Sequence, residues 1–166
     1  MKNIKRVLCL VLTLLMVAST VSVFAAFSDV PTTASYEKAV SALSQLGIIK
    51  GYDDGTFKPD NDVTRAEFTA MLMRTMGAGS IGSSSSADLP FSDVSDQNSD
   101  ISWSIPNINT AYKNGIVNGY EDGTFRPNDK VAYEEAVKMV VCALGYGENI
   151  SVDATPWYSN FMAQAR

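Results

Sequence analysis

Apolar residues recur at helical spacing in four stretches of the 166-residue chain. The stretches cover residues 36–46, 68–75, 105–112 and 136–144, and each is followed by a glycine that can end a helix, namely Gly47, Gly77, Gly115 and Gly145. The residues that share a face are, in the same order, Tyr36, Ala39, Val40, Leu43 and Leu46; Phe68, Met71, Leu72 and Thr75; Ile105, Ile108, Ala111 and Tyr112; and Ala136, Val137, Val140, Val141 and Leu144. Pro106 fits only in the first turn of its helix. The pattern predicts two pairs of amphipathic helices.

The two helix pairs belong to an internal repeat. The motif FSDV occurs at 27–30 and 91–94, and GYDDGTFKPDNDVTRAEF at 51–68 returns as GYEDGTFRPNDKVAYEEA at 119–136. The second copy has four extra residues before its first helix, and the tail from Trp157 resembles the segment from Trp103. We therefore divide the chain into repeat 1 (26–76), a Gly/Ser-rich linker (77–87), repeat 2 (88–150) and the beginning of repeat 3 (151–166), which we expect to be the front part of a longer protein.

The predicted fold class is mainly α. A single two-helix unit buries too little surface for a core of its own, so stacked copies are expected to share one core. An incomplete third repeat is also expected to leave apolar surface exposed, which favours association.

The first 25 residues are predicted to be a secretory signal peptide rather than fold material. Lys2, Lys5 and Arg6 precede an apolar run that is too short for a membrane span, and the small residues up to Ala25 provide a cleavage site. With these three basic residues removed, the net charge falls from −5 to −8. A chain this acidic is a poor partner for nucleic acid or anionic membranes, so any anion must be held by a local site.

Cleavage leaves Cys142 as the single thiol, in an apolar run typical of a buried structural cysteine. The chain has no histidine, which excludes Ser-His and Cys-His nucleophiles and imidazole metal sites. Asp29 and Asp93 follow Phe-Ser and are expected to accept hydrogen bonds from nearby turn backbone rather than to act as a hydrolytic carboxylate pair. No catalytic residue, metal or cofactor is predicted.

The Asp54-Gly55 and Asp122-Gly123 pairs raise two structural possibilities. Acidic residues beside glycine are found in calcium loops, but the alternating oxygen ligands of such a loop are incomplete here. The alternative is a tight turn in which Asp-Gly supplies a positive φ, and this is the interpretation we adopt.

Residues 64–67 (TRAE) combine a structural and a chemical signal. Thr64 and Glu67 have the spacing of a capping box, which predicts the N-terminus of the second helix and contributes about 1 kcal/mol. Arg65 then falls at the first helical position, where a cation is unfavourable by about 0.3–1 kcal/mol. Beside unpaired helix N–H groups, Arg65 is either an anion-binding residue or an ordinary solvated arginine. Repeat 2 has Ala132 and Tyr133 instead, so its own anion site is expected to be absent.

Two tryptophans, Trp103 and Trp157, stand before the first helices of repeats 2 and 3. Each is either a core residue or an aromatic surface on which a sugar ring can stack.

Together these motifs resemble the S-layer homology (SLH) repeat, whose signature is FSDV, a helix ending before GIIxGYxDGTFxP, and a TRAE-like start to the second helix. The resemblance covers essentially the whole chain after residue 25 except the linker. It implies a pseudo-threefold helical prism that anchors an exported protein to the bacterial envelope by binding secondary cell-wall polysaccharide, often pyruvylated. The location implied is the cell surface or cell wall of a Gram-positive-type bacterium.

The resemblance also assigns residues. Arg65 is the main ligand-binding residue, and the groove-lining neighbours are Gly51, Tyr52, Trp103, Gly119 and Tyr120. Thr64, Glu67, Asp54, Gly55, Asp122 and Gly123 have structural roles. Two alternatives stay open for the whole protein: a structural S-layer subunit that contacts other subunits, or the anchor of a wall-active or glycan-degrading enzyme.

Overall fold

The computed structural model describes residues 27–79, 81–147, 150–151 and 153–166. The predicted signal peptide, residues 1–25, lies outside the described residues. The described helices are α2 (Glu37–Gln45), α3 (Arg65–Thr75), α4 (Ser99–Ser102), α5 (Ile105–Lys113), α6 (Tyr133–Ala143) and α7 (Ser159–Gln164). The same residues contain no β-strand, only an isolated antiparallel bridge between Thr64 and Lys130. The mainly helical fold class is therefore confirmed, and none of these helices is long and apolar enough to cross a membrane.

The four helices predicted from apolar spacing correspond to α2, α3, α5 and α6. Pro106 lies in the first turn of α5, as its missing N–H requires. The capping box of α3 is present, because the Thr64 hydroxyl accepts from the Glu67 amide and the Glu67 carboxylate accepts from the Thr64 amide. Helix α4 was not predicted. It forms in the four-residue insertion of repeat 2, with Asn98 as its N-cap.

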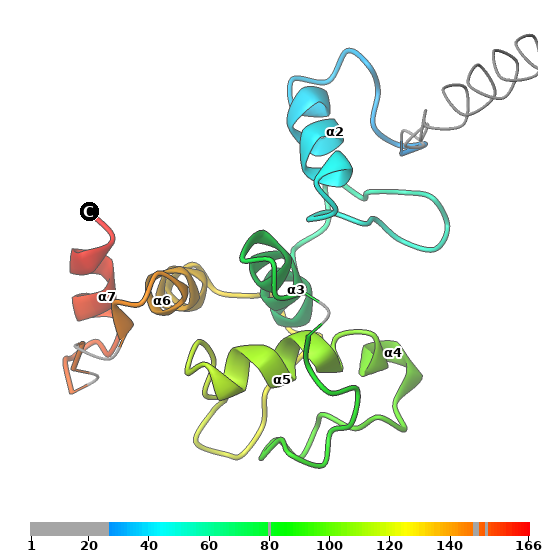
Figure 1. Ribbon diagram of the computed structural model, residues 1–166. Helices are drawn as coiled ribbons and strands as arrows, with labels where there is room; N and C mark the ends of the chain where they lie inside the picture. The colour runs from blue at the N-terminus through cyan, green and yellow to red at the C-terminus, as the bar shows by residue number, and fades with distance from the viewer. Residues whose placement is uncertain (1–26, 80, 148–149, 152) are drawn as a thin grey trace, which may run out of the picture.

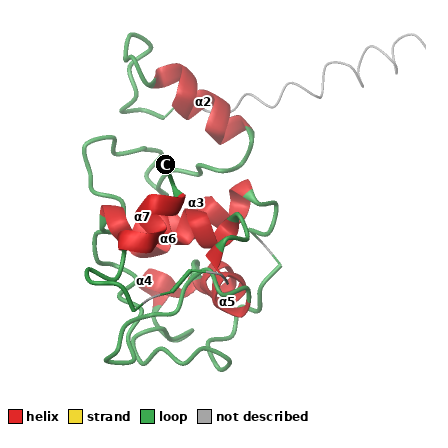
Figure 2. Ribbon diagram, turned by 90° about the vertical axis from the view of Figure 1, so that its left-hand side faces the viewer, coloured by secondary structure: helices red, strands yellow, loops and turns green. Residues whose placement is uncertain are grey.

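Helices pack across repeat boundaries. The main contacts join α3 to α5, α6 to α7, and α3 to α6, so the second helix of repeat 1 lies against both helices of repeat 2, and the second helix of repeat 2 lies against α7. Both views show α2 standing apart from the cluster that α3 to α7 form (Figures 1 and 2). The buried core combines Met73 of repeat 1 with residues of repeat 2, including Phe91, Val94, Ile101, Ile105, Ile108, Ala111, Ile116, Val117, Phe125 and Met139. The expectation that copies share one core is confirmed.

The predicted helix faces were only partly right. On α2 only Val40 is buried, and Leu46 is 73% exposed, because this helix makes none of the main interhelix contacts. On α6 Val140 and Leu144 are exposed, while Met139 and Val141 are buried. On α3 the buried residues are Arg65, Ala66, Thr69, Ala70 and Met73. Of the predicted face, Phe68 and Leu72 are half-buried against the core, Met71 is half-buried, and Thr75 is exposed. Since α3 touches both α5 and α6, its small residues occupy the contact surface.

Each FSDV aspartate ties the start of its repeat to the distant turn. Asp29 accepts hydrogen bonds from the amides of Phe57 and Lys58, both at 2.7 Å, and Asp93 does the same for Phe125 (2.8 Å) and Arg126 (2.7 Å). These bonds, that from Phe57 above all, hold the pKa of Asp29 below its ordinary value. Lys58 and Arg126 have positive φ angles of 56° and 59°, a strained conformation that the carboxylates stabilise. The turn-binding role expected for both aspartates is confirmed.

The Asp-Gly segments are tight turns. Asp54 Oδ1 accepts from the Thr56 amide (3.0 Å) and hydroxyl (2.5 Å), and Gly55 has φ +78°. Asp122 makes the same two bonds with Thr124, and its pKa is lowered to about 2 by these bonds and by Arg126. The carboxylates are therefore engaged within the turn, consistent with the structural role assigned to Asp54, Gly55, Asp122 and Gly123.

Candidate functional site

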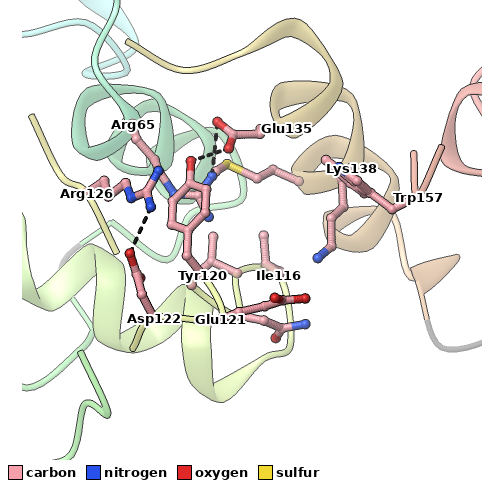
Figure 3. A pocket seen from close by; sticks show the side chains of 13 residues that line it. Arg65, Ile116, Tyr120, Glu121, Asp122, Arg126, Glu135, Lys138 and Trp157 are labelled. Carbon is pink, nitrogen blue, oxygen red and sulfur yellow. Dashed lines mark hydrogen bonds and ion pairs between the residues drawn. The ribbon is translucent and has the colours of Figure 1, made fainter. Parts of the chain in front are cut away.

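A cavity of about 500 Å³ lies between the start of α3, the loop and α6 of repeat 2, and Trp157 (Figure 3). Repeat 1 contributes one side chain, Arg65, from the start of α3. Repeat 2 contributes the loop before its turn and part of α6, and Trp157 comes from the segment that precedes α7. The lining residues are Arg65, Ile116, Val117, Asn118, Gly119, Tyr120, Glu121, Asp122, Arg126, Glu135, Lys138, Met139 and Trp157.

Arg65 is buried in this junction, with only 6% of its surface exposed. Its Nη1 lies 3.3 Å from Glu135 Oε2, and its guanidinium carbon lies 5.0 Å from the Tyr120 ring centroid and 4.9 Å from that of Phe125. Its Nε has no hydrogen-bond partner among the described residues. Of the two alternatives that the sequence left open, the solvated surface arginine is excluded.

The N-terminus of α3 does not offer free N–H groups. The amides of Arg65 and Ala66 donate to the carbonyls of Asp129 and Pro127, each at 2.9 Å, and that of the third helical residue donates to the Thr64 hydroxyl at 3.2 Å. The expectation of unpaired helix amides beside Arg65 was therefore wrong. The turn that precedes α6 supplies the missing carbonyls, so any contact of Arg65 with an anion must come from its guanidinium.

The Glu135 carboxylate connects Arg65, Tyr120 and the start of α6. Its carboxylate accepts hydrogen bonds from the Tyr120 hydroxyl and from the Ala132 amide (3.1 Å), besides pairing with Arg65. Burial and the bond to Glu135 raise the pKa of Tyr120 to about 12. Although repeat 2 lacks the capping hydroxyl, as expected from Ala132, the glutamate half of its capping box remains.

Repeat 1 contains the same tyrosine–glutamate pair. The Tyr52 hydroxyl donates to Glu67 Oε1 at 2.7 Å, and this bond is the first cause that raises the Tyr52 pKa to about 12. Tyr52 does not line the cavity, whereas Tyr120 does. Both tyrosines therefore connect a turn to the following helix, and Tyr120 in addition faces the cavity.

The predicted groove residues divide between two places. Gly119 and Tyr120 lie beside Arg65, whereas Gly51, Tyr52 and Trp103 are not among the residues that line this cavity. Trp103 is 47% exposed, and its indole N–H donates to the Asp100 carbonyl at 3.0 Å. Its counterpart Trp157, 40% exposed, occupies the cavity instead.

Gly51 and Gly119 have a shared structural requirement. Both have positive φ, +68° and +74°, and a Cβ on either would collide with the ring of the FSDV phenylalanine, Phe27 or Phe91. A glycine at these positions therefore lets the phenylalanine pack against the turn, independently of any ligand.

Comparison with known proteins agrees with this architecture. The family model of the S-layer homology domain matches residues 26–69 and 90–137, which is more than half of the chain. The chain belongs to the S-layer homology family. An S-layer homology domain is a non-catalytic anchoring domain, which agrees with the prediction that these residues are not an enzyme.

The relatives of this S-layer homology chain carry the names of surface proteins and of glucanases. A "Cell surface protein" of Thermoanaerobacter kivui is 33% identical over all of the chain and 21% of its own length. A "Surface layer protein" of Brevibacillus choshinensis is 35% identical over 70% of the chain and 10% of its own length. An "Endoglucanase" of Bacillus sp. strain KSM-635 is 37% identical over 74% of the chain and 12% of its own length. The chain thus spans about a fifth or less of these relatives.

Proposed function

We propose that this chain anchors an exported protein non-covalently to the bacterial cell envelope by binding a secondary cell-wall polysaccharide. The ligand is an anionic, carboxylate-bearing glycan of the pyruvylated kind, and the cell is of the Gram-positive type. The observation that supports the proposal is the cavity between α3, repeat 2 and Trp157, in which a buried arginine, a partly exposed indole and loop backbone converge.

The cavity has the components that a sugar site needs. Trp157 offers an apolar ring face on which a pyranose can stack. Asn118 and Gly119 add loop backbone and an amide for hydroxyl groups, and Arg65 adds a guanidinium suited to a planar carboxylate. An acidic chain without its leader does not attract anions in general, so binding of an acidic glycan depends on such a local cation.

The relatives support envelope anchoring as the common property. Their printed names include a "Cellulosome-anchoring protein" of Acetivibrio thermocellus as well as surface layer proteins and an endoglucanase. The same anchor is therefore compatible with a structural S-layer subunit or with a wall-active enzyme as the remainder of the protein. The lattice-subunit role is the second candidate, favoured by the surface layer protein among the relatives.

Cosedimentation with purified cell walls tests the proposal. We expect wild type to pellet with intact walls and to stay soluble with walls from which the secondary polymer has been stripped. Arg65→Met should lose most of the binding, because it removes the guanidinium but keeps an unbranched side chain. Lys130→Met, on an exposed lysine outside the cavity, is the charge-matched control and should bind as wild type. Equal binding to intact and stripped walls would refute the proposal.

A further inference from the structure

Lys138 is the one lysine that lines the cavity. It is half-buried on α6, one turn beyond Glu135, and its Nζ lies 5.6 Å from the ring centroid of Trp157 and 5.8 Å from that of Phe161. Figure 3 shows Lys138 and Trp157 together on the side of the cavity across from Arg65. In repeat 1 the matching position is Ala70, which is fully buried. The lysine is thus a departure from the repeat pattern at the cavity wall.

The other cavity cations are already balanced. Arg65 pairs with Glu135 at 3.3 Å, and Arg126 pairs with Asp122 at 2.8 Å. Among the described residues, Lys138 forms neither an ion pair nor a hydrogen bond. Burial is the main cause that lowers the pKa of Lys138. The positive charge left without a partner at the cavity wall is therefore that of Lys138.

The carboxylate of an acidic sugar in this cavity would face different competition for Arg65 and for Lys138. To contact Arg65 alone, its carboxylate must compete with Glu135, which is itself held by Tyr120 and Ala132. A carboxylate near Lys138 displaces no existing ion pair, although Glu121 also lines the cavity, and a sugar stacked on Trp157 lies beside the ammonium group. A half-buried ammonium without a counterion gains a charge-assisted hydrogen bond when such a group arrives.

We propose that Lys138 is a specificity-determining residue of this site, which binds the carboxylate of a sugar stacked on Trp157 and so makes the cavity select acidic over neutral glycans. The inference rests on the proposed function, because it takes the cavity to be the glycan site. Arg65 and Lys138 then contact the bound glycan from opposite sides of the cavity, and Lys138, which forms no ion pair with the described residues, adds the charge that favours an acidic sugar.

The test compares an acid with its neutral ester. The probes are a hexoside with a 4,6-linked pyruvate ketal, as free acid and as carboxyl methyl ester, and a methyl glucuronide in the same two forms, titrated calorimetrically. Wild type should bind one of the free acids about tenfold or more tightly than its ester. The acid preferred, ketal or uronate, identifies the source of the carboxylate.

Lys138→Met should reduce affinity for the preferred acid by about tenfold and leave affinity for the ester unchanged, because methionine keeps the unbranched stem against Trp157 and Phe161. Lys138→Arg should retain the preference. Lys130→Met, which removes the same charge from an exposed position, should behave as wild type.

The two levels of the hypothesis fail differently. If wild type binds the acid tightly and Lys138→Met binds it equally well, the role of Lys138 is wrong while the glycan site stands. If wild type binds neither the acids nor the esters, the proposed function itself is contradicted.

Discussion

The ion pair between Arg65 and Glu135 yields a prediction about stability that depends on its burial. The two side chains are 8% and 14% exposed, and they come from different repeats. Removing one member of a buried pair leaves the other charge uncompensated, which typically costs about 3–5 kcal/mol. Glu135→Gln leaves Arg65 without its carboxylate, so we expect a loss near the lower end, about 3 kcal/mol, given the partial exposure of Glu135.

The reverse substitution should cost less. In Arg65→Met, Glu135 keeps the hydrogen bonds from Tyr120 and Ala132, so its charge remains solvated by the protein. We expect a loss of about 1–2 kcal/mol. The double variant should be more stable than the sum of the two losses implies, with a coupling of about 1–2 kcal/mol, because no buried charge remains in it.

Urea unfolding followed by circular dichroism gives the free energy of unfolding of all three variants. In thermal unfolding of a chain of this size, a loss of about 3 kcal/mol lowers Tm by about 6–12 °C. The exposed pair Asp62–Lys130 also links repeats 1 and 2, at 2.7 Å, and is the matched control. Its removal should cost about 0–1 kcal/mol. If Glu135→Gln costs no more than this control, Arg65 is not buried against Glu135 and the junction of repeats is wrong.

Three further predictions concern the turns. In urea unfolding, Gly119→Ala should lower the free energy of unfolding by about 2 kcal/mol more than Gly123→Ala. Both glycines have positive φ, but only at Gly119 would a Cβ lie within 4 Å of other atoms. Equal losses in the two variants would contradict this. Asp122→Asn should make stability less sensitive to acid than in wild type. Because the pKa of Asp122 is lowered to about 2, the carboxylate stabilises the fold at pH values above its ordinary pKa of 3.8, and this stabilisation is lost as pH falls through about 2. The same dependence of stability on pH in the variant and in wild type would refute the assignment. Ultraviolet titration should show Tyr52 and Tyr120 ionising near pH 12, and stability should fall as pH rises from 10 towards 12. Replacing either tyrosine by phenylalanine should remove one of the two ionisations near pH 12. Ionisation of all tyrosines near pH 10 in the folded protein would be inconsistent with the hydrogen bonds to Glu67 and Glu135.

Local features of this fold were predictable from the sequence. The capping box of Thr64 and Glu67 and the turn at Gly55 form between residues a few positions apart, so spacing alone identifies them. The helices α2, α3, α5 and α6 follow from apolar periodicity and their terminal glycines. The internal repeat also allowed the role of Asp29 to be assigned together with that of Asp93.

Features that depend on neighbouring repeats could not be predicted in the same way. The burial of Arg65 results from Tyr120, Phe125 and Glu135, which lie far away in the sequence. The buried face of α3 was assigned only in part, with Phe68 and Leu72 against the core, because one periodic pattern cannot show that two other helices contact this helix. The sequence does show that Lys138 differs from its counterpart Ala70 when the two repeats are aligned. Only the structure shows that Lys138 lines the cavity.

The cavity as a glycan site can be tested most directly with the two tryptophans, which are the only ones in the chain. In a ¹⁵N-labelled sample titrated with released cell-wall polysaccharide, each indole N–H gives its own NMR signal. The Trp157 signal should move on binding, because its ring faces the cavity, and that of Trp103 should stay, because its indole is bonded to Asp100 outside it. A saturable shift of Trp103 with an unmoved Trp157 would contradict the account.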